Sequence, residues 1–490
     1  MLSEHIQKME SQTEDLVLNL STNLEWINSA QITNEDLKGK IVVLFFWTSC
    51  CINCRHSLPY ISKLQKKYEE DPVVFIGVHS PKYDNEKHLA TLKNILARQG
   101  IEYPVVNDRK MEMMSEYGIK SWPTFLVSGP QGRLLFSLCG ENQKELLDDY
   151  IDSVLNYYSE FSSSKIEQPL SLSKHICYPE KIVCDASAQK LYISDTCFNR
   201  VLITDLEGNC LDCIKGFNQP RGIFLDGDCL FVADTGNHCV KAVHLKTKLV
   251  ATLAGNGWQG RDYKGGEIGM AQALSSPWDL VKIDNRIYIA MAGTHQIWIL
   301  DLDTGVAKNY SGCGAEQNYN SVNVQLAAWA QPAGIAKGEH QLYVADSESS
   351  TIRSIDLMAN STSTLVGGSA DSQDLFSFGD KDGQGDEAKL QRPMAVQWLP
   401  SFKKIVVADT FNHKIKWIDP ITLSLSTLCG KGEAGHRDGS FEDALFNEPS
   451  GIACHEYLIY VADTNNSCIR VIDLLKRTVD TLDLKGIPHD

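Results

Sequence analysis

The chain divides into two parts with different hydrophobic periods. In the first part, unbroken apolar runs at residues 41–46 and 73–80 predict buried strands, and residues 55–64 carry apolar side chains at helical spacing. From about residue 176 the helical period disappears, and short apolar strands separated by turn residues recur. The pattern therefore predicts an α/β domain followed by an all-β region.

A Cys-x-x-Cys motif stands between the first apolar run and the predicted helix. This places Cys51 at a strand-to-helix turn, where unpaired N–H groups and the helix dipole stabilise a thiolate and lower the pKa of a cysteine. Cys54, one turn further on, can close a disulfide with Cys51. A zinc site would need two more ligands at matching spacing, and the next cysteine, Cys139, has no such partner.

These residues resemble the active site of the thioredoxin superfamily. Pro59 matches the proline that kinks the active-site helix, and Pro123 matches the cis-proline that faces the cysteine pair. The strand at residues 73–80 and the helical insert after it resemble the TlpA-like branch of the superfamily.

The match covers about residues 20–160, after an N-terminal extension at residues 1–19. The resemblance implies a TlpA-like thioredoxin domain in which Cys51 attacks a substrate disulfide, Cys54 resolves the intermediate and Pro123 shapes the groove.

Four residues depart from the thioredoxin pattern. Cys50 replaces the usual tryptophan before the first cysteine, and Asn53 replaces a frequent proline before the second. Phe45 stands where a buried aspartate accepts a proton, so deprotonation of Cys54 must rely on water or another group. Trp122 replaces a small or aliphatic residue, which partly fills the expected groove. Cys50 is either a second resolving thiol or a small buried hydrophobe. Dithiol chemistry and a binding-only scaffold both remain open.

Composition limits the classes of protein that the chain can represent. Its 490 residues are too many for one core and predict two or three domains. No window approaches a membrane-spanning length of apolar residues, and the first residues lack the features of a secretory signal. The net charge of −16 argues against binding to nucleic acid or to anionic membranes.

Cysteine is frequent but does not form a paired framework. The chain has 15 cysteines, an odd number, and most stand singly inside apolar strands. Free, buried thiols in the cytosol explain this distribution better than disulfides of a secreted protein.

A segment of one apolar pattern recurs six times in the second part. Its opening prolines are Pro179, Pro220, Pro277, Pro332, Pro393 and Pro449. Each repeat contains four short strands, and its second strand mostly ends in aspartate before a tight turn. One such sheet cannot bury its own faces, so six repeats predict a six-bladed β-propeller.

The pattern Pro-x-Gly-Ile followed by Tyr-Val-Ala-Asp-Thr-x-Asn-His resembles the NHL repeat. It covers about residues 176–484, after a linker at residues 161–175 and before a tail at residues 485–490. A TlpA-like thioredoxin domain followed by six NHL repeats resembles the NHL repeat-containing protein 2 family. Members of that family in animals carry a further C-terminal β-rich segment, and we expect this chain, which ends at Asp490, to lack it.

The repeated polar residues favour a structural interpretation. The turn aspartates can accept backbone N–H bonds, and histidines at one position in different blades lie too far apart to share a metal ion. Residues 379–387 lack the full spacing of a calcium loop. We therefore expect no metal or cofactor.

Long loops join most blades and should emerge on one face of the propeller. We expect this face to bind one or more protein partners, and we expect the chain to be a cytosolic monomer. Two functions remain open. The chain is a thiol–disulfide oxidoreductase whose propeller holds the substrate protein, or a non-catalytic interaction scaffold.

Overall fold

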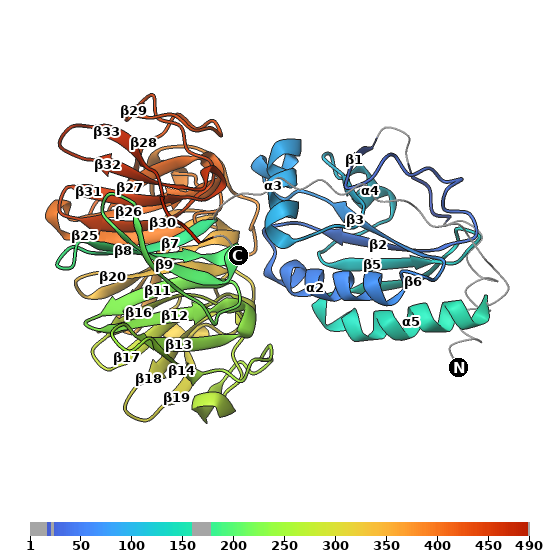
Figure 1. The fold of residues 1–490 in the computed structure, drawn as a ribbon, viewed down its shortest axis with the longest axis horizontal. Coiled ribbons are helices and arrows are strands. Elements are labelled where there is room, and N and C mark those ends of the chain that lie inside the picture. Colours follow the sequence, from blue (N-terminus) through green and yellow to red (C-terminus); the bar gives the residue numbers. More distant parts are fainter. Residues whose placement is uncertain (1–16, 21–23, 159–177, 489–490) are drawn as a thin grey trace. The chain divides into compact units, whose positions relative to one another are not determined.

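The computed structural model describes residues 17–20, 24–158 and 178–488, and the contacts divide the chain into two compact units between residues 174 and 175 (Figure 1). The predicted linker at residues 161–175 lies outside the described residues, as does the predicted extension up to residue 16. Each unit has hydrophobic clusters of its own.

The first unit is a mixed sheet with helices on both faces. Its elements are β1 (Glu25–Ile27), β2 (Ile41–Trp47), α2 (Ile52–Lys67), β3 (Val73–His79), α3 (Leu89–Gln99), β4 (Val105–Asn107), α4 (Glu112–Glu116), β5 (Thr124–Ser128), β6 (Leu134–Cys139) and α5 (Lys144–Tyr157). The strand order is β1-β4-β3-β2-β5-β6, with β2, β3 and β4 parallel and the others antiparallel to their neighbours.

The central strand β2 is buried along its whole length because its two faces belong to two different cores. Alternate residues such as Val43 and Phe45 pack with α2, α3 and α5 in the first core. Val42 and Leu44 pack with α4 in the second core. A strand covered on both faces has an unbroken apolar run. Leu18 also lies in the second core, so part of the segment assigned by sequence to the extension belongs to this domain.

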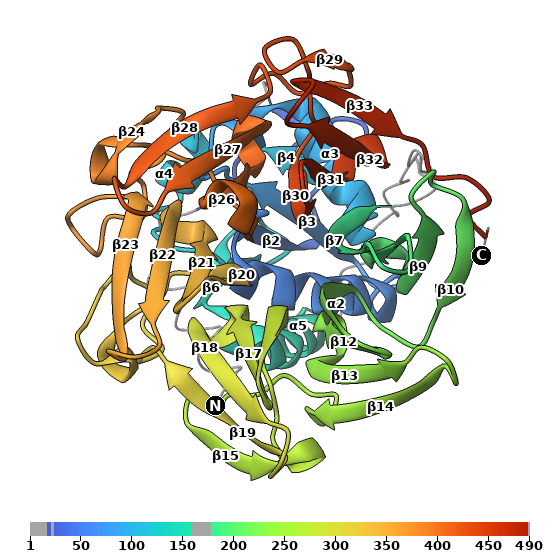
Figure 2. The ribbon, with the colours of Figure 1, turned by 90° about the vertical axis from the view of Figure 1, so that its left-hand side faces the viewer.

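The second unit is a six-bladed β-propeller within residues 178–488 (Figure 2). The blades are β7 (Pro179–Asp185), β8 (Lys190–Asp195), β9 (Arg200–Asp205) and β10 (Cys210–Ile214); β11 (Pro220–Asp226), β12 (Cys229–Asp234), β13 (Cys239–His244) and β14 (Leu249–Ala254); β16 (Pro277–Ile283), β17 (Arg286–Met291), β18 (Gln296–Asp301) and β19 (Val306–Ser311); β20 (Pro332–Lys337), β21 (Gln341–Asp346), β22 (Thr351–Asp356) and β23 (Ser361–Gly367); β25 (Ala395–Leu399), β26 (Lys404–Asp409), β27 (Lys414–Asp419) and β28 (Ser424–Cys429); β30 (Pro449–His455), β31 (Leu458–Asp463), β32 (Cys468–Asp473) and β33 (Thr478–Leu482). The predicted fold class, a thioredoxin-like α/β domain plus a six-bladed propeller, is confirmed.

The first strand of each blade contacts the first strands of both neighbouring blades, and β30 contacts β7. These strands therefore line the axis and close the ring. The four main strands of each blade are consecutive in the described chain.

The loops between blades are more ordered than the sequence suggests. Three of them add a short strand to the outer edge of the blade that follows: β15 (Gly265–Ile268), β24 (Gly383–Gln384) and β29 (Gly439–Ser440) pair with β19, β28 and β33. The segment after β33 does the same to the first blade, where Lys485 exchanges backbone hydrogen bonds with Gly208 and Cys210. Residues 485–488, assigned by sequence to a tail, thus pair with the propeller.

Candidate active site of the first unit

Cys51 lies at the N-terminal end of α2. It has an extended backbone, with φ −72° and ψ 121°, and it immediately precedes the first helical residue, Ile52. No side chain caps this end, and the first turn of α2 contains no acidic residue. The positive end of the helix dipole is therefore not offset by a carboxylate of the helix itself. A thiolate is stabilised in such a position.

The two motif cysteines differ in accessibility. Cys54 is fully buried and packs inside the first core, whereas Cys51 is half-buried and packs at the edge of that core. An accessible cysteine followed one turn later by a shielded one suits an attacking thiol and a resolving thiol.

The peptide bond between Trp122 and Pro123 is cis, as the resemblance implied. Pro123 lies at the same edge of the sheet as the cysteines, because Phe46 near the end of β2 pairs with Thr124 at the start of β5. The carbonyl of Pro123 accepts a hydrogen bond of 2.8 Å from Gly140 N–H, which joins this turn to the end of β6. The fold thus brings the three predicted site residues to one edge of the sheet.

The structure shows what replaces the missing aspartate. Phe45 is buried, and its ring stacks on Phe125 with a centroid separation of 4.9 Å. An aromatic ring cannot accept the proton of Cys54, so this departure persists in the fold. Trp122 is half-buried and packs against both cores of the domain.

Cys50 is fully buried, and its sulfur lies 3.5 Å from the hydroxyl of Thr48. Of the two interpretations left open by the sequence, this burial favours a small core residue over a second resolving thiol.

The sequence interpretation missed a buried carboxylate beside the motif. Glu86, in the turn after β3, is fully buried and accepts hydrogen bonds from backbone N–H groups of Ser49 at 3.0 Å and Cys50 at 3.2 Å. His79, also fully buried, places Nε2 3.8 Å from Glu86 Oε1 and packs edge-on against Trp47. The one sequence signal for this cluster is a histidine at the end of an otherwise apolar strand.

The repeated aspartates of the propeller are structural, as the sequence analysis expected. Each is fully buried and accepts a backbone N–H bond of 2.7 or 2.8 Å from the segment that leads into its own blade: Asp195, Asp234, Asp346, Asp409 and Asp463. Each also contacts an arginine or lysine of the third strand. The third blade has Met291 instead, whose sulfur accepts a hydrogen bond from Ser275 N–H.

The repeated histidines join neighbouring blades. Nδ1 of His238 accepts a hydrogen bond of 2.9 Å from Ser276 N–H, and Nδ1 of His413 accepts one of 3.1 Å from Glu448 N–H. His295 contacts the carbonyl of Ala330. Within the described ranges, no three His, Cys, Asp or Glu side chains form a group that could hold a metal ion.

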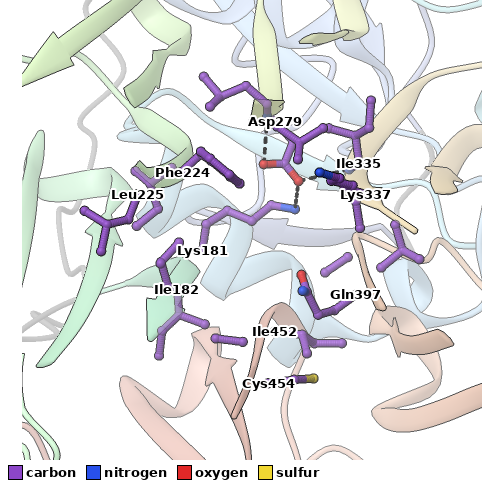
Figure 3. A pocket seen from close by; sticks show the side chains of 18 of the residues that line it. Lys181, Ile182, Phe224, Leu225, Asp279, Ile335, Lys337, Gln397, Ile452 and Cys454 are labelled. Atoms are coloured by element: carbon purple, nitrogen blue, oxygen red, sulfur yellow. Dashed lines mark hydrogen bonds and ion pairs between the residues drawn. The ribbon is translucent and has the colours of Figure 1, made fainter. Parts of the chain in front are cut away.

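A cavity of about 200 Å³ lies on the propeller axis and is lined by the first strands of all six blades (Figure 3). Lys181 crosses it and places Nζ 3.0 Å from Asp279 Oδ2 (Figure 3). The same Nζ lies 2.9 Å from the carbonyl oxygen of Met394. Asp279 also accepts hydrogen bonds from two backbone N–H groups. The charged groups thus satisfy each other and link residues of different blades at the axis.

Among the described residues, no helix is both long and apolar enough to cross a bilayer.

Known proteins are similar to this chain in both of its units. A thioredoxin-like family model matches residues 39–134. NHL repeat-containing protein 2 of Gallus gallus is 39% identical over 98% of this chain and 73% of its own length. The chloroplastic protein SUPPRESSOR OF QUENCHING 1 of Arabidopsis thaliana is 41% identical over 99% of this chain, which spans 49% of that relative. The thiol-disulfide oxidoreductase ResA of Bacillus anthracis is 30% identical over 26% of this chain and 71% of its own length.

Proposed function

This chain belongs to the NHL repeat-containing protein 2 family, and on that premise we propose that its first unit is a thiol–disulfide oxidoreductase acting on a protein that the propeller holds. The observation that carries the proposal is the pairing of an accessible Cys51 at an uncapped helix N-terminus with a buried Cys54 one turn later. The similarity of this unit to a named thiol-disulfide oxidoreductase supports it.

In the proposed reaction, the Cys51 thiolate attacks one sulfur of a substrate disulfide, and the other substrate sulfur leaves as a thiolate. Cys54 then loses its proton and attacks the Cys51 sulfur, which releases the second substrate thiolate and leaves a Cys51–Cys54 disulfide. The substrate gains two electrons and the protein loses two, so turnover requires a dithiol reductant. Water or another group takes the proton of Cys54, since Phe45 cannot.

Trapping of the intermediate tests this proposal. Cys54→Ser removes the resolving thiol and should accumulate a mixed disulfide between Cys51 and the substrate protein. Cys139→Ser, which alters an exposed cysteine on β6, is the control and should accumulate none. Absence of a mixed disulfide in Cys54→Ser would argue against the enzyme.

The second candidate is a non-catalytic scaffold, and the stacked Phe45 at the position of the proton acceptor favours it. In that case Cys51→Ser combined with Cys54→Ser would leave partner binding and cellular function unchanged. Loss of function with both units folded would support the enzyme.

We further propose the cytosol as the location and a monomer as the working form. The strand cysteines of the propeller support a reducing compartment, because Cys184, Cys239, Cys429 and Cys454 are unpaired. Burial raises the pKa of Cys184 to about 11 and also raises the pKa of Cys239. Mass mapping of the native protein under non-reducing conditions should find no bridge between blades.

A further inference from the structure

Two adjacent cysteines, Cys50 and Cys51, precede α2, and only one of them can be the nucleophile of the proposed reaction. The carboxylate of Glu86 distinguishes them. One of its oxygens accepts the N–H groups of Ser49 at 3.0 Å and Cys50 at 3.2 Å. The other accepts the N–H groups of Lys82 and Tyr83, both at 3.1 Å.

Two hydroxyl groups complete the shell of donors. Thr48 Oγ1 lies 3.0 and 3.1 Å from the two carboxylate oxygens, and the hydroxyl of Ser49 donates to one of them. Hydrogen bonds from this many donors favour the ionised form of a carboxylate. Glu86 therefore fixes a negative charge directly beside the backbone of Cys50.

This charge has a specific consequence for Cys50. A thiolate there would be a second negative charge in a buried site, which is unfavourable at short range and low dielectric. The N–H group of Cys50, which could otherwise stabilise such a thiolate, is already taken by the carboxylate. Cys51 is placed differently, at a helix end that no side chain caps.

We propose that Glu86 selects between the adjacent thiols, holding Cys50 as a neutral thiol and leaving Cys51 as the one nucleophile; this selection rests on the proposed oxidoreductase function. Glu86 is fully buried and acts through the backbone of Cys50, so it is a positioning residue. This role predicts that the second cysteine next to the motif does not compete for Cys54.

Other titratable groups lie near Glu86 and the two cysteines. His79 of β3 lies 3.8 Å from Glu86, and its ring has no hydrogen-bond partner among the described residues. Cys51 immediately precedes α2, and Cys54 lies in the first turn of that helix. The ammonium of Lys82 lies 5.3 Å from the centre of the Tyr83 ring. Of these groups, Glu86 is the one that accepts a hydrogen bond from the backbone N–H of Cys50.

The test measures the alkylation of Cys50 by iodoacetamide as a function of pH, in the full chain carrying Cys51→Ser and with each modified cysteine identified by mass mapping. The plateau rate at high pH reports access to the thiol, and the midpoint reports its charge. Adding Glu86→Gln should lower the midpoint by about one pH unit or more, since a charge of the same sign no longer opposes ionisation.

Asp108→Asn is the matched control. Asp108 is also buried, but its carboxylate accepts hydrogen bonds from Ser80 Oγ and from the backbone N–H groups of Met113 and Met114, not from residues 48–50. This variant should leave the Cys50 midpoint unchanged. An unchanged midpoint in Glu86→Gln, with near-ultraviolet circular dichroism intact, would overturn the proposal, because a purely structural clamp alters access and not charge.

A second measurement decides the matter if Glu86→Gln does not fold. Mild oxidation of the unaltered chain should give a Cys51–Cys54 disulfide, and a bridge that includes Cys50 would contradict the selection. Failure of the proposed function has a different signature, since Cys51 itself would then be unreactive in the unaltered chain whatever the midpoint of Cys50.

Discussion

At the scale of single residues, both units contain buried carboxylates that accept hydrogen bonds from backbone N–H groups. In the propeller this device recurs in five blades, and Asp346 with Arg353 shows it clearly. Both side chains are fully buried, with Arg353 Nη1 3.0 Å from Asp346 Oδ2. Burial lowers the pKa of Arg353, while the neighbouring Asp346 opposes this shift. The aspartate therefore compensates a charge that has no access to solvent.

Removing Asp346 should be costly. Asp346→Ala leaves a buried guanidinium without a carboxylate and two backbone N–H groups without an acceptor, so we expect a loss of about 3–5 kcal/mol of unfolding free energy. Asp346→Met combined with Arg353→Met should lower the unfolding free energy by less, because the third blade has the buried residues Met291 and Trp298 at the two equivalent positions. Urea unfolding measures both. A loss in Asp346→Ala no larger than in Asp356→Ala, at a turn of the same blade, would contradict this.

The residue scale also marks the limit of prediction from sequence. The cis bond at Pro123 and the position of Cys51 were predictable, because local motifs specify them. Glu86 was not, since its partners are mostly backbone N–H groups that any residue type supplies. The replacement of the buried aspartate by Phe45 was visible in the sequence, but its stacking on Phe125 required the register of β2 against β5.

At the scale of elements, the first strands of the blades approach each other closely. The residues two positions after the opening prolines alternate around the ring between glycine and larger residues: Lys181, Gly222, Asp279, Gly334, Ala395 and Gly451. A Cβ atom on Gly451 would lie 2.4 Å from the carbonyl oxygen of Glu180, and one on Gly222 would lie 2.4 Å from Asp279 Cα. The repeat was predictable from its turn residues, but this packing around the axis was not.

Gly451→Ala should therefore destabilise the propeller by about 1–3 kcal/mol, because the added methyl group meets backbone that cannot move without opening the ring. Gly383→Ala is the control, since its Cβ would make only contacts of 3.4 Å or more. Thermal unfolding of both variants checks the prediction. Equal melting temperatures for the two would refute the packing argument.

At the scale of the whole molecule, the propeller closes by two kinds of contact. The first and last blades meet along β7 and β30, and the segment after β33 pairs with the outer edge of the first blade. Leu484 and Ile487 of this segment pack in the cluster shared by these two blades. Arg200 Nη1 donates to the carbonyl of Pro488 at 2.7 Å. The sequence did not reveal this closure, because the segment is short and lacks the repeat pattern.

Truncation tests the closing segment. A chain that ends at Leu482 should melt at a lower temperature and show faster hydrogen exchange in β10, since it loses two backbone bonds from Lys485 and two apolar contacts. A chain that ends at Pro488 retains these contacts and should behave as the full chain does. Identical exchange of β10 in both truncations would show that the segment does not hold the ring.

The central claim concerns the reactivity of Cys51, and its rate of alkylation by iodoacetamide at neutral pH tests that claim most directly. Cys139 is the internal reference, because it is exposed on β6 and does not stand at a helix N-terminus. Stabilisation of the thiolate by α2 predicts that Cys51 reacts about tenfold faster than Cys139 or more, despite its lower exposure. A Cys51 that reacts no faster than Cys139 would contradict the oxidoreductase and favour the scaffold.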